Sequence, residues 1–88
     1  MAFKKLRGVP LPVEKQLLIR AICLNYGDRP QWEQKKIVRL CNECGGAYTA
    51  ALFEMMTTQQ SVTAISLMYH VSESVLYDIR KKFYMRWY

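Results

Sequence analysis

The sequence predicts an all-α fold of about five short helices in a single domain. Apolar residues recur at spacings of three and four, and no segment alternates between apolar and polar residues with a period of two. Glycine and proline interrupt this pattern at intervals that leave segments of helix length between them. A chain of 88 residues suits one domain with one core and leaves no room for a second.

The composition argues against a disordered chain and favours an anionic partner. Hydrophobic residues make up 51% of the sequence and aromatic residues 12%, which is more apolar material than a disordered chain carries. The formal net charge of +6 favours nucleic acid ahead of a membrane surface. The alternative is a basic protein without a polyanionic partner, and composition alone supports both.

The sequence predicts neither a targeting segment nor a membrane-spanning one. Its basic start is followed by Pro10 and Pro12, and no apolar run approaches the roughly 20 residues that span a bilayer. The three cysteines are an odd number, which favours free thiols in a reducing compartment over a disulfide framework. We therefore expect a cytoplasmic protein with no membrane partner.

Residues 1–12 are expected to form a basic N-terminal tail with Lys4, Lys5 and Arg7, followed by a helical domain over 13–88. The first predicted helix, 13–27, ends at Gly27, because glycine accepts the left-handed conformation that follows a helix. Its apolar residues exceed a single stripe, which predicts burial on more than one side. They are Val13, Leu17, Leu18, Ala21, Ile22 and Leu24.

The second and third predicted helices each have one buried face. The second, 31–44, stops at Gly45 and Gly46, and Asp28 is expected to cap its start. Its buried face has the spacing i, i+3, i+4 and i+7 and consists of Ile37, Leu40, Cys41 and Cys44. The third, 47–56, directs Tyr48, Leu52 and Met55 inward, with Ala51 and Met56 beside them.

The last two predicted helices lie close together in the chain. Ser61 is expected to cap the fourth, 62–69, whose inward residues are Val62, Ile65 and either Met68 or Tyr69. Ser72 is expected to cap the fifth, and Val71 and Leu76 have the spacing of a hydrophobic staple. The fifth buries Leu76, Ile79, Phe83 and Trp87. Two short helices joined by three or four residues predict a helix-turn-helix at about 61–85.

The stretch "SVTAISLMYHVSESVLYDIRKKF" resembles the helix-turn-helix of sigma factor region 4 and of many transposases and resolvases. Ile65 and Ser66 fill the apolar–small pair of that motif, and its second part is filled by Val71, Ser72, Ser74, Leu76 and Tyr77. The layout of the whole chain is similar to that of small phage and prophage transcription regulators. The sequence departs from the motif at His70, where glycine is common and a positive φ is expected, and in the acidic residues Glu73 and Asp78.

The resemblance and the charge together predict sequence-specific binding of double-stranded DNA and regulation of transcription in a phage or mobile element. The final helix would enter the major groove with its N-terminal part against base edges. The candidates for base readout are Ser72, Glu73, Ser74 and Tyr77, with Asp78 behind them. The candidates for phosphate contact are Arg80, Lys81, Lys82 and Arg86, beside an outward aromatic stripe of Tyr77, Tyr84 and Tyr88.

Both charged groups of this helix have an alternative explanation. An acidic side chain can accept a hydrogen bond from cytosine N4, but Glu73 also suits the positive end of the helix dipole. The cations from Arg80 onward suit the negative end of the helix dipole in the same way. In this alternative they belong to a solvated helix end.

The sequence predicts no catalytic residues, no metal and no cofactor. "CNECGG" contains the C-x-x-C half of a zinc knuckle, but no second close pair of ligands accompanies Cys23 and His70. Cys41 and Cys44 also belong to an apolar helix face, where free cysteine acts as a small hydrophobe. No acid pair, phosphate-cradling loop or nucleophile elbow is present, so we do not expect an enzyme.

The competing function is a protein-interaction module, either an adaptor or an inhibitor, that keeps the helix-turn-helix as a scaffold. The chain has more aromatic residues than one small core can hold. An aromatic C-terminal helix could form a homodimer or bind a polymerase or another protein. The two functions are compatible, since regulators of this kind bind paired half-sites as dimers.

Overall fold

The computed structural model describes Leu6 and residues 8–88, and this part of the chain is all-α, with no strand. The all-α prediction is therefore confirmed. The α-helices are α1 (Val13–Leu24), α2 (Gln31–Gly45), α3 (Thr49–Thr57), α4 (Val62–Tyr69) and α5 (Glu73–Arg86). Short 3-10 helices, η1 (Tyr26–Asp28) and η2 (Gly46–Tyr48), join α1 to α2 and α2 to α3. No helix in the described residues has both the length and the apolar character to cross a membrane.

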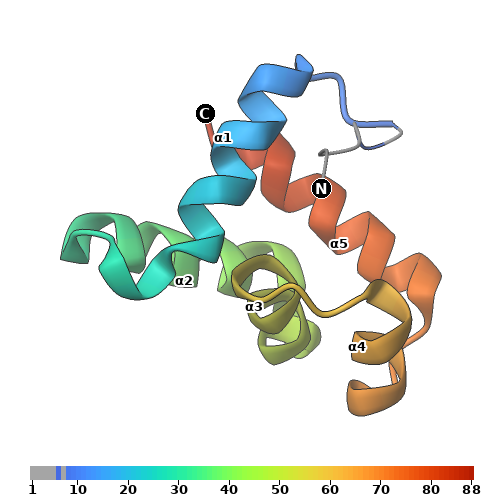
Figure 1. Ribbon diagram of the computed structural model, residues 1–88. Helices are drawn as coiled ribbons and strands as arrows, with labels where there is room; N and C mark the ends of the chain where they lie inside the picture. Colours follow the sequence, from blue (N-terminus) through green and yellow to red (C-terminus); the bar gives the residue numbers. More distant parts are fainter. Residues whose placement is uncertain (1–5, 7) are drawn as a thin grey trace.

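Helix α3 lies at the centre of the arrangement and packs against each of the other four helices. Helix α5 runs diagonally from its corner with α4 to the side of α1, as Figure 1 shows. It also packs against α2, so it closes one side of the molecule. The position of α5 therefore depends on contacts with α2, α3 and α4.

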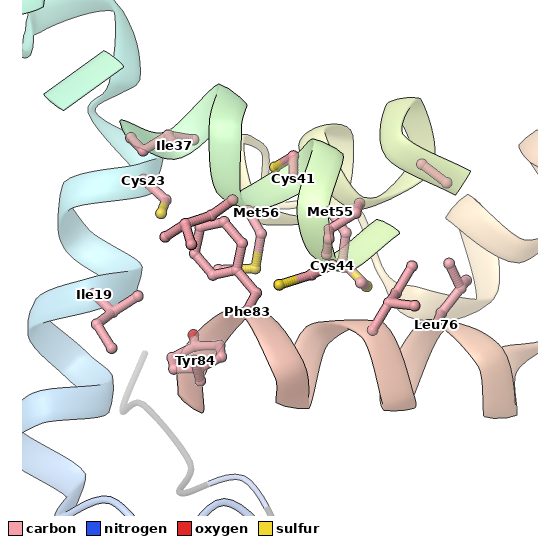
Figure 2. Packing of buried hydrophobic residues seen from close by; sticks show 14 of the residues in the cluster. Ile19, Cys23, Ile37, Cys41, Cys44, Met55, Met56, Leu76, Phe83 and Tyr84 are labelled. Carbon is pink, nitrogen blue, oxygen red and sulfur yellow. The ribbon is translucent and has the colours of Figure 1, made fainter. Parts of the chain in front are cut away.

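The core is formed where α1, α2, α3 and α5 meet (Figure 2). The predicted inward face of α2 is confirmed, because all four of its residues are buried. The predicted inward face of α5 is confirmed in the same way. Around Phe83, which is fully buried, Figure 2 shows Cys23, Cys44 and Met56 from the three other helices. Cysteine and methionine sulfur thus fills much of the space between the larger side chains.

Helix α1 is buried on one side only, although its sequence predicts burial on more than one side. The rest of the fold covers only part of its apolar surface. Only Gln16, Ile19 and Cys23 are buried, and they form one stripe. Leu17 and Leu18 are 47% and 53% exposed, so the prediction of burial on more than one side is wrong. The helix also ends at Leu24 rather than at Gly27, since the chain tightens into η1.

Two smaller expectations also fail. Tyr48 is 41% exposed because it belongs to η2, which precedes the first turn of α3. Asp28 makes no side-chain cap for α2; Pro30 holds the cap position, and Arg29 instead pairs with buried Glu33.

The expectations for α4 hold. Ile65 is fully buried, and of the two alternatives the half-buried Tyr69 packs against the core. The Ser61 hydroxyl caps the helix by accepting a hydrogen bond from the Ala64 amide at 3.0 Å.

Of the residues before α1, Leu6, Val9 and Leu11 pack on the core. The Gln16 side chain is fully buried; its Oε1 accepts from the Leu6 amide at 2.9 Å, and its Nε2 donates to the Val9 and Leu11 carbonyls. Val9 is 4% exposed and belongs to the core cluster. The predicted basic residues Lys4, Lys5 and Arg7 lie outside the described residues.

Arg20 joins α1 to the end of α3. Its Nη1 donates to the Met55 and Met56 carbonyls at 2.7 and 2.9 Å, and its Nη2 donates to the Thr58 carbonyl at 2.8 Å. The last carbonyls of an α-helix have no partner within the helix, and the negative end of the helix dipole attracts a cation. One guanidinium therefore satisfies three carbonyls at the point where the chain leaves α3 for α4.

We expect the substitution Arg20→Met to lower the free energy of unfolding by about 2–3 kcal/mol, since it removes charge-assisted hydrogen bonds and leaves carbonyls unpaired. Urea denaturation followed by circular dichroism measures this change. Lys35→Met is the control, because Lys35 is exposed on α2, and it should change stability by less than about 0.5 kcal/mol. Equal losses in both variants would contradict the role of Arg20.

Candidate nucleic-acid interface

Helices α4 and α5 meet in a tight corner of three residues, His70 to Ser72. His70 adopts the left-handed conformation, with φ 56° and ψ 45°, and the expected positive φ is therefore present. The Ser72 hydroxyl accepts a hydrogen bond from the Val75 amide at 3.4 Å and caps α5. The cap that the sequence predicts for α5 is thus confirmed.

The Ser66 hydroxyl fixes the corner from inside. It donates to the Val71 carbonyl at 2.5 Å, while the Val71 amide donates to the Ser66 carbonyl at 3.1 Å. These reciprocal bonds tie the last turn of α4 to the residue before the cap of α5. The motif predicts only a small residue at Ser66. It does not predict these hydrogen bonds, because a serine hydroxyl at that position also suits a solvent-facing site.

An apolar layer seals the inner side of the corner. Ile65 and Leu76 are fully buried, and Val71 and Ile79 are 7% and 6% exposed. Because α4 and α5 share this layer, they pack against each other as well as against α3. The corner therefore holds the first turns of α5 at a fixed angle to the rest of the fold.

The outer side of the corner carries most of the predicted readout residues. All candidates for base readout are exposed, namely Ser72, Glu73, Ser74, Tyr77 and Asp78. Lys81, a candidate for phosphate contact, is exposed as well. Ser72 and Ser74 lie close together, with their hydroxyl oxygens 3.3 Å apart. Tyr77 is 46% exposed, and Arg80 lies over its ring at 5.2 Å from the centroid.

The prediction that Tyr84 lies on this outward face is wrong. Its side chain is 1% exposed, and burial raises the pKa of its hydroxyl to about 12. Figure 2 shows Tyr84 on the side of α5 that faces Ile19 of α1, so α1 covers Tyr84 and leaves Tyr77 open to solvent. Tyr88 is 61% exposed, with Lys15 over its ring, and the expected aromatic stripe is therefore interrupted.

The predicted phosphate contacts differ in their accessibility. Lys81, Lys82 and Arg86 are exposed, whereas Arg80 is half-buried. Burial lowers the pKa of Arg80, and its stacking on Tyr77 holds it beside the helix. The charges on the first turns of α5 are the acidic Glu73 and Asp78, and the cations begin only at Arg80. Negative charge therefore precedes positive charge along the exposed side of this helix.

The segment before α1 passes beside the middle of α5. A β-carbon on Gly8, whose φ is +75°, would lie 3.7 Å from the Lys81 Nζ. The buried Gln16 side chain hydrogen-bonds to the backbone of Leu6, Val9 and Leu11. These bonds position Gly8 beside Lys81. Sequence patterns do not predict this approach, because it depends on a buried glutamine within an otherwise apolar helix face.

The three cysteines belong to the core. Cys23, Cys41 and Cys44 are free and buried, and burial raises the pKa of the Cys23 and Cys41 thiols to about 12. Burial also raises the pKa of Cys44. Within the part of the chain that the structure describes, no group of three or more potential ligands lies together to hold a metal ion.

No family model, curated protein or solved structure matches this chain. Its function is therefore inferred from its own geometry.

We expect His70→Gly to raise the free energy of unfolding by about 0.5–1 kcal/mol, because glycine adopts a positive φ without the steric cost of a β-carbon. His70→Val should lower it by about 1–2 kcal/mol, because a β-branched residue is the least suited to this conformation. Thermal and urea denaturation of both variants measure the difference. A glycine variant less stable than the native chain would show that the histidine side chain supports the corner.

We expect the Cys23 and Cys41 thiols to resist a disulfide reagent at pH 8 in the folded chain and to react on unfolding in guanidinium. Their pKa values are raised in the folded chain, so the stability from burying them is present below about pH 9 and lost as pH rises toward about 12. Colorimetric thiol counting at pH 8, with and without guanidinium, measures the reactivity. Rapid reaction of more than one thiol in the folded chain would contradict the burial of Cys23 and Cys41.

Proposed function

We propose that this protein binds double-stranded DNA through α4 and α5, acting as a helix-turn-helix. One observation carries the proposal: a tight corner of three residues presents the exposed side of the start of α5 while its other side is sealed in the core. A helix presented in this way fits the major groove, which is about 12 Å wide. The net charge of +6 supports an anionic partner.

In this proposal the exposed residues of α5 divide into two groups along the helix. Ser72, Glu73 and Ser74 would meet base edges, where hydroxyls donate or accept and the Glu73 carboxylate accepts from cytosine N4. Lys81 and Lys82 would contact phosphates, which positions the helix without reading sequence. Glu73 and Asp78 near phosphates cost binding energy wherever no base donor meets them, so they would favour particular sequences over others.

We further propose that the bound DNA is a control site and that the chain regulates transcription, as the motif's resemblance to phage-type regulators implies. A homodimer would place two copies of α5 in successive major grooves about 34 Å apart. In such a dimer the two copies would pack through the exposed apolar side of α1, which carries Leu17, Leu18 and Ala21. This side faces away from the core, so the interface would leave α5 free for DNA.

A second candidate function is favoured by the exposed apolar residues of α4. Leu67 is 73% exposed and Met68 49%, and α4 contains no charged residue. Large exposed apolar side chains beside the acidic start of α5 suit a protein partner better than a phosphate backbone. In this case the same corner would bind a polymerase or another protein, and DNA would not compete for it.

Fluorescence anisotropy of a labelled mixed-sequence duplex tests the first proposal at about 50 and 200 mM salt. We expect binding that weakens steeply with salt, and Lys81→Ala/Lys82→Ala should bind on the order of tenfold more weakly at the lower salt. Each lost phosphate contact should also reduce the salt slope by about 0.9.

The control variant is Lys15→Ala/Lys35→Ala, which removes the same charge from exposed positions on α1 and α2. It should retain most of the affinity and nearly all of the salt slope. The DNA proposal fails if the native chain shows no binding at the lower salt, and that outcome would favour the protein-partner function. Equal losses in the two double variants would mean that net charge, not α5, determines binding.

A further inference from the structure

A shallow groove of about 390 Å³ lies between the end of α2 and the exposed side of α5. Glu43 and Cys44 of α2 form one wall. The other wall belongs to α5 and includes Asp78, Lys81, Lys82 and Arg86. Three cations and two carboxylates thus line a single hollow on the surface.

The groove continues directly from the proposed readout surface. Asp78 and Lys81 line it, and both are also exposed on the side of α5 that carries Ser74 and Tyr77. A duplex held with its bases against the start of α5 would therefore extend one strand of its backbone toward this hollow. The residues on the far side of the hollow belong to α2, which the sequence did not connect with nucleic acid.

Glu43 is the acidic residue at the α2 side of this groove. It lies between Arg86, which lines the groove, and Arg39 of α2, which lies outside it. Its Oε1 is 4.0 Å from the Arg39 Nε, and its Oε2 is 3.7 Å from the Arg86 Nη1. All three side chains are exposed, at 63% for Arg39, 45% for Glu43 and 58% for Arg86. Neither distance is that of a tight hydrogen-bonded pair, and exposed pairs of this kind contribute little to stability.

We propose that this groove holds the phosphodiester backbone of bound DNA and that Glu43 stands in for a phosphate between Arg39 and Arg86 when DNA is absent. The inference rests on the proposed DNA-binding function and adds α2 to the binding surface. A phosphate offers more acceptor oxygens and more charge than the carboxylate, and arginine binds phosphate in a bidentate way. DNA therefore displaces Glu43 at small cost, and the acidic residue limits affinity for any polyanion.

Replacing the carboxylate tests this role. Glu43→Gln keeps the size of the side chain, removes the charge and frees both arginines for phosphate. In the same anisotropy titration we expect roughly three- to tenfold tighter binding at about 50 mM salt. The slope of log affinity against log salt should steepen by up to about 1. Arg39→Gln should have the opposite effect, with weaker binding and a shallower slope.

Glu14→Gln is the matched control, since Glu14 is exposed in the first turn of α1, does not line the groove and carries the same charge. Circular dichroism of each variant verifies that the fold is retained. If the native chain binds DNA but Glu43→Gln behaves like Glu14→Gln, or Arg39→Gln binds like the native chain, the groove inference is overturned and the α5 proposal stands. If the native chain fails to bind DNA at the lower salt, both are overturned.

Discussion

The contact between Arg20 and the end of α3 is the interaction on which the rest of this structure depends. Helix α3 packs against all the other helices, and the chain turns toward α4 immediately after the carbonyls that Arg20 binds. Without a cation there, the end of a central helix would present unpaired carbonyls inside the protein. Arg20 therefore links α1 to the segment that sets the position of the α4–α5 corner.

Periodicity and capping predicted the parts of the fold that depend on neighbouring residues. The buried faces of α2 and α5 follow from spacing, and the caps at Ser61 and Ser72 follow from side-chain chemistry next to an apolar run. The contacts of Arg20 with residues 35 to 38 positions away could not be predicted in this way. Tyr84 was misplaced because spacing alone does not say where α1 covers α5.

The candidate site was likewise predictable only where it depends on residues close together in the sequence. The exposed residues at the start of α5 follow from the motif, whereas the groove beside Glu43 depends on how α2 and α5 pack. Sequence also misjudged the surface of α1, because an apolar residue such as Leu18 carries no mark of whether another helix will cover it. Surfaces between elements distant in the chain are the part that only a structure supplies.

Helix α4 is anchored far more weakly than the helices around it. Ile65 is its one buried residue, whereas α3 and α5 each bury four. A helix of eight residues with so little buried surface opens locally at a low free energy, so its amide protons should exchange before those of the core. A partner that covers α4 would suppress this opening, and the complex would lose the conformational entropy of α4 as it forms.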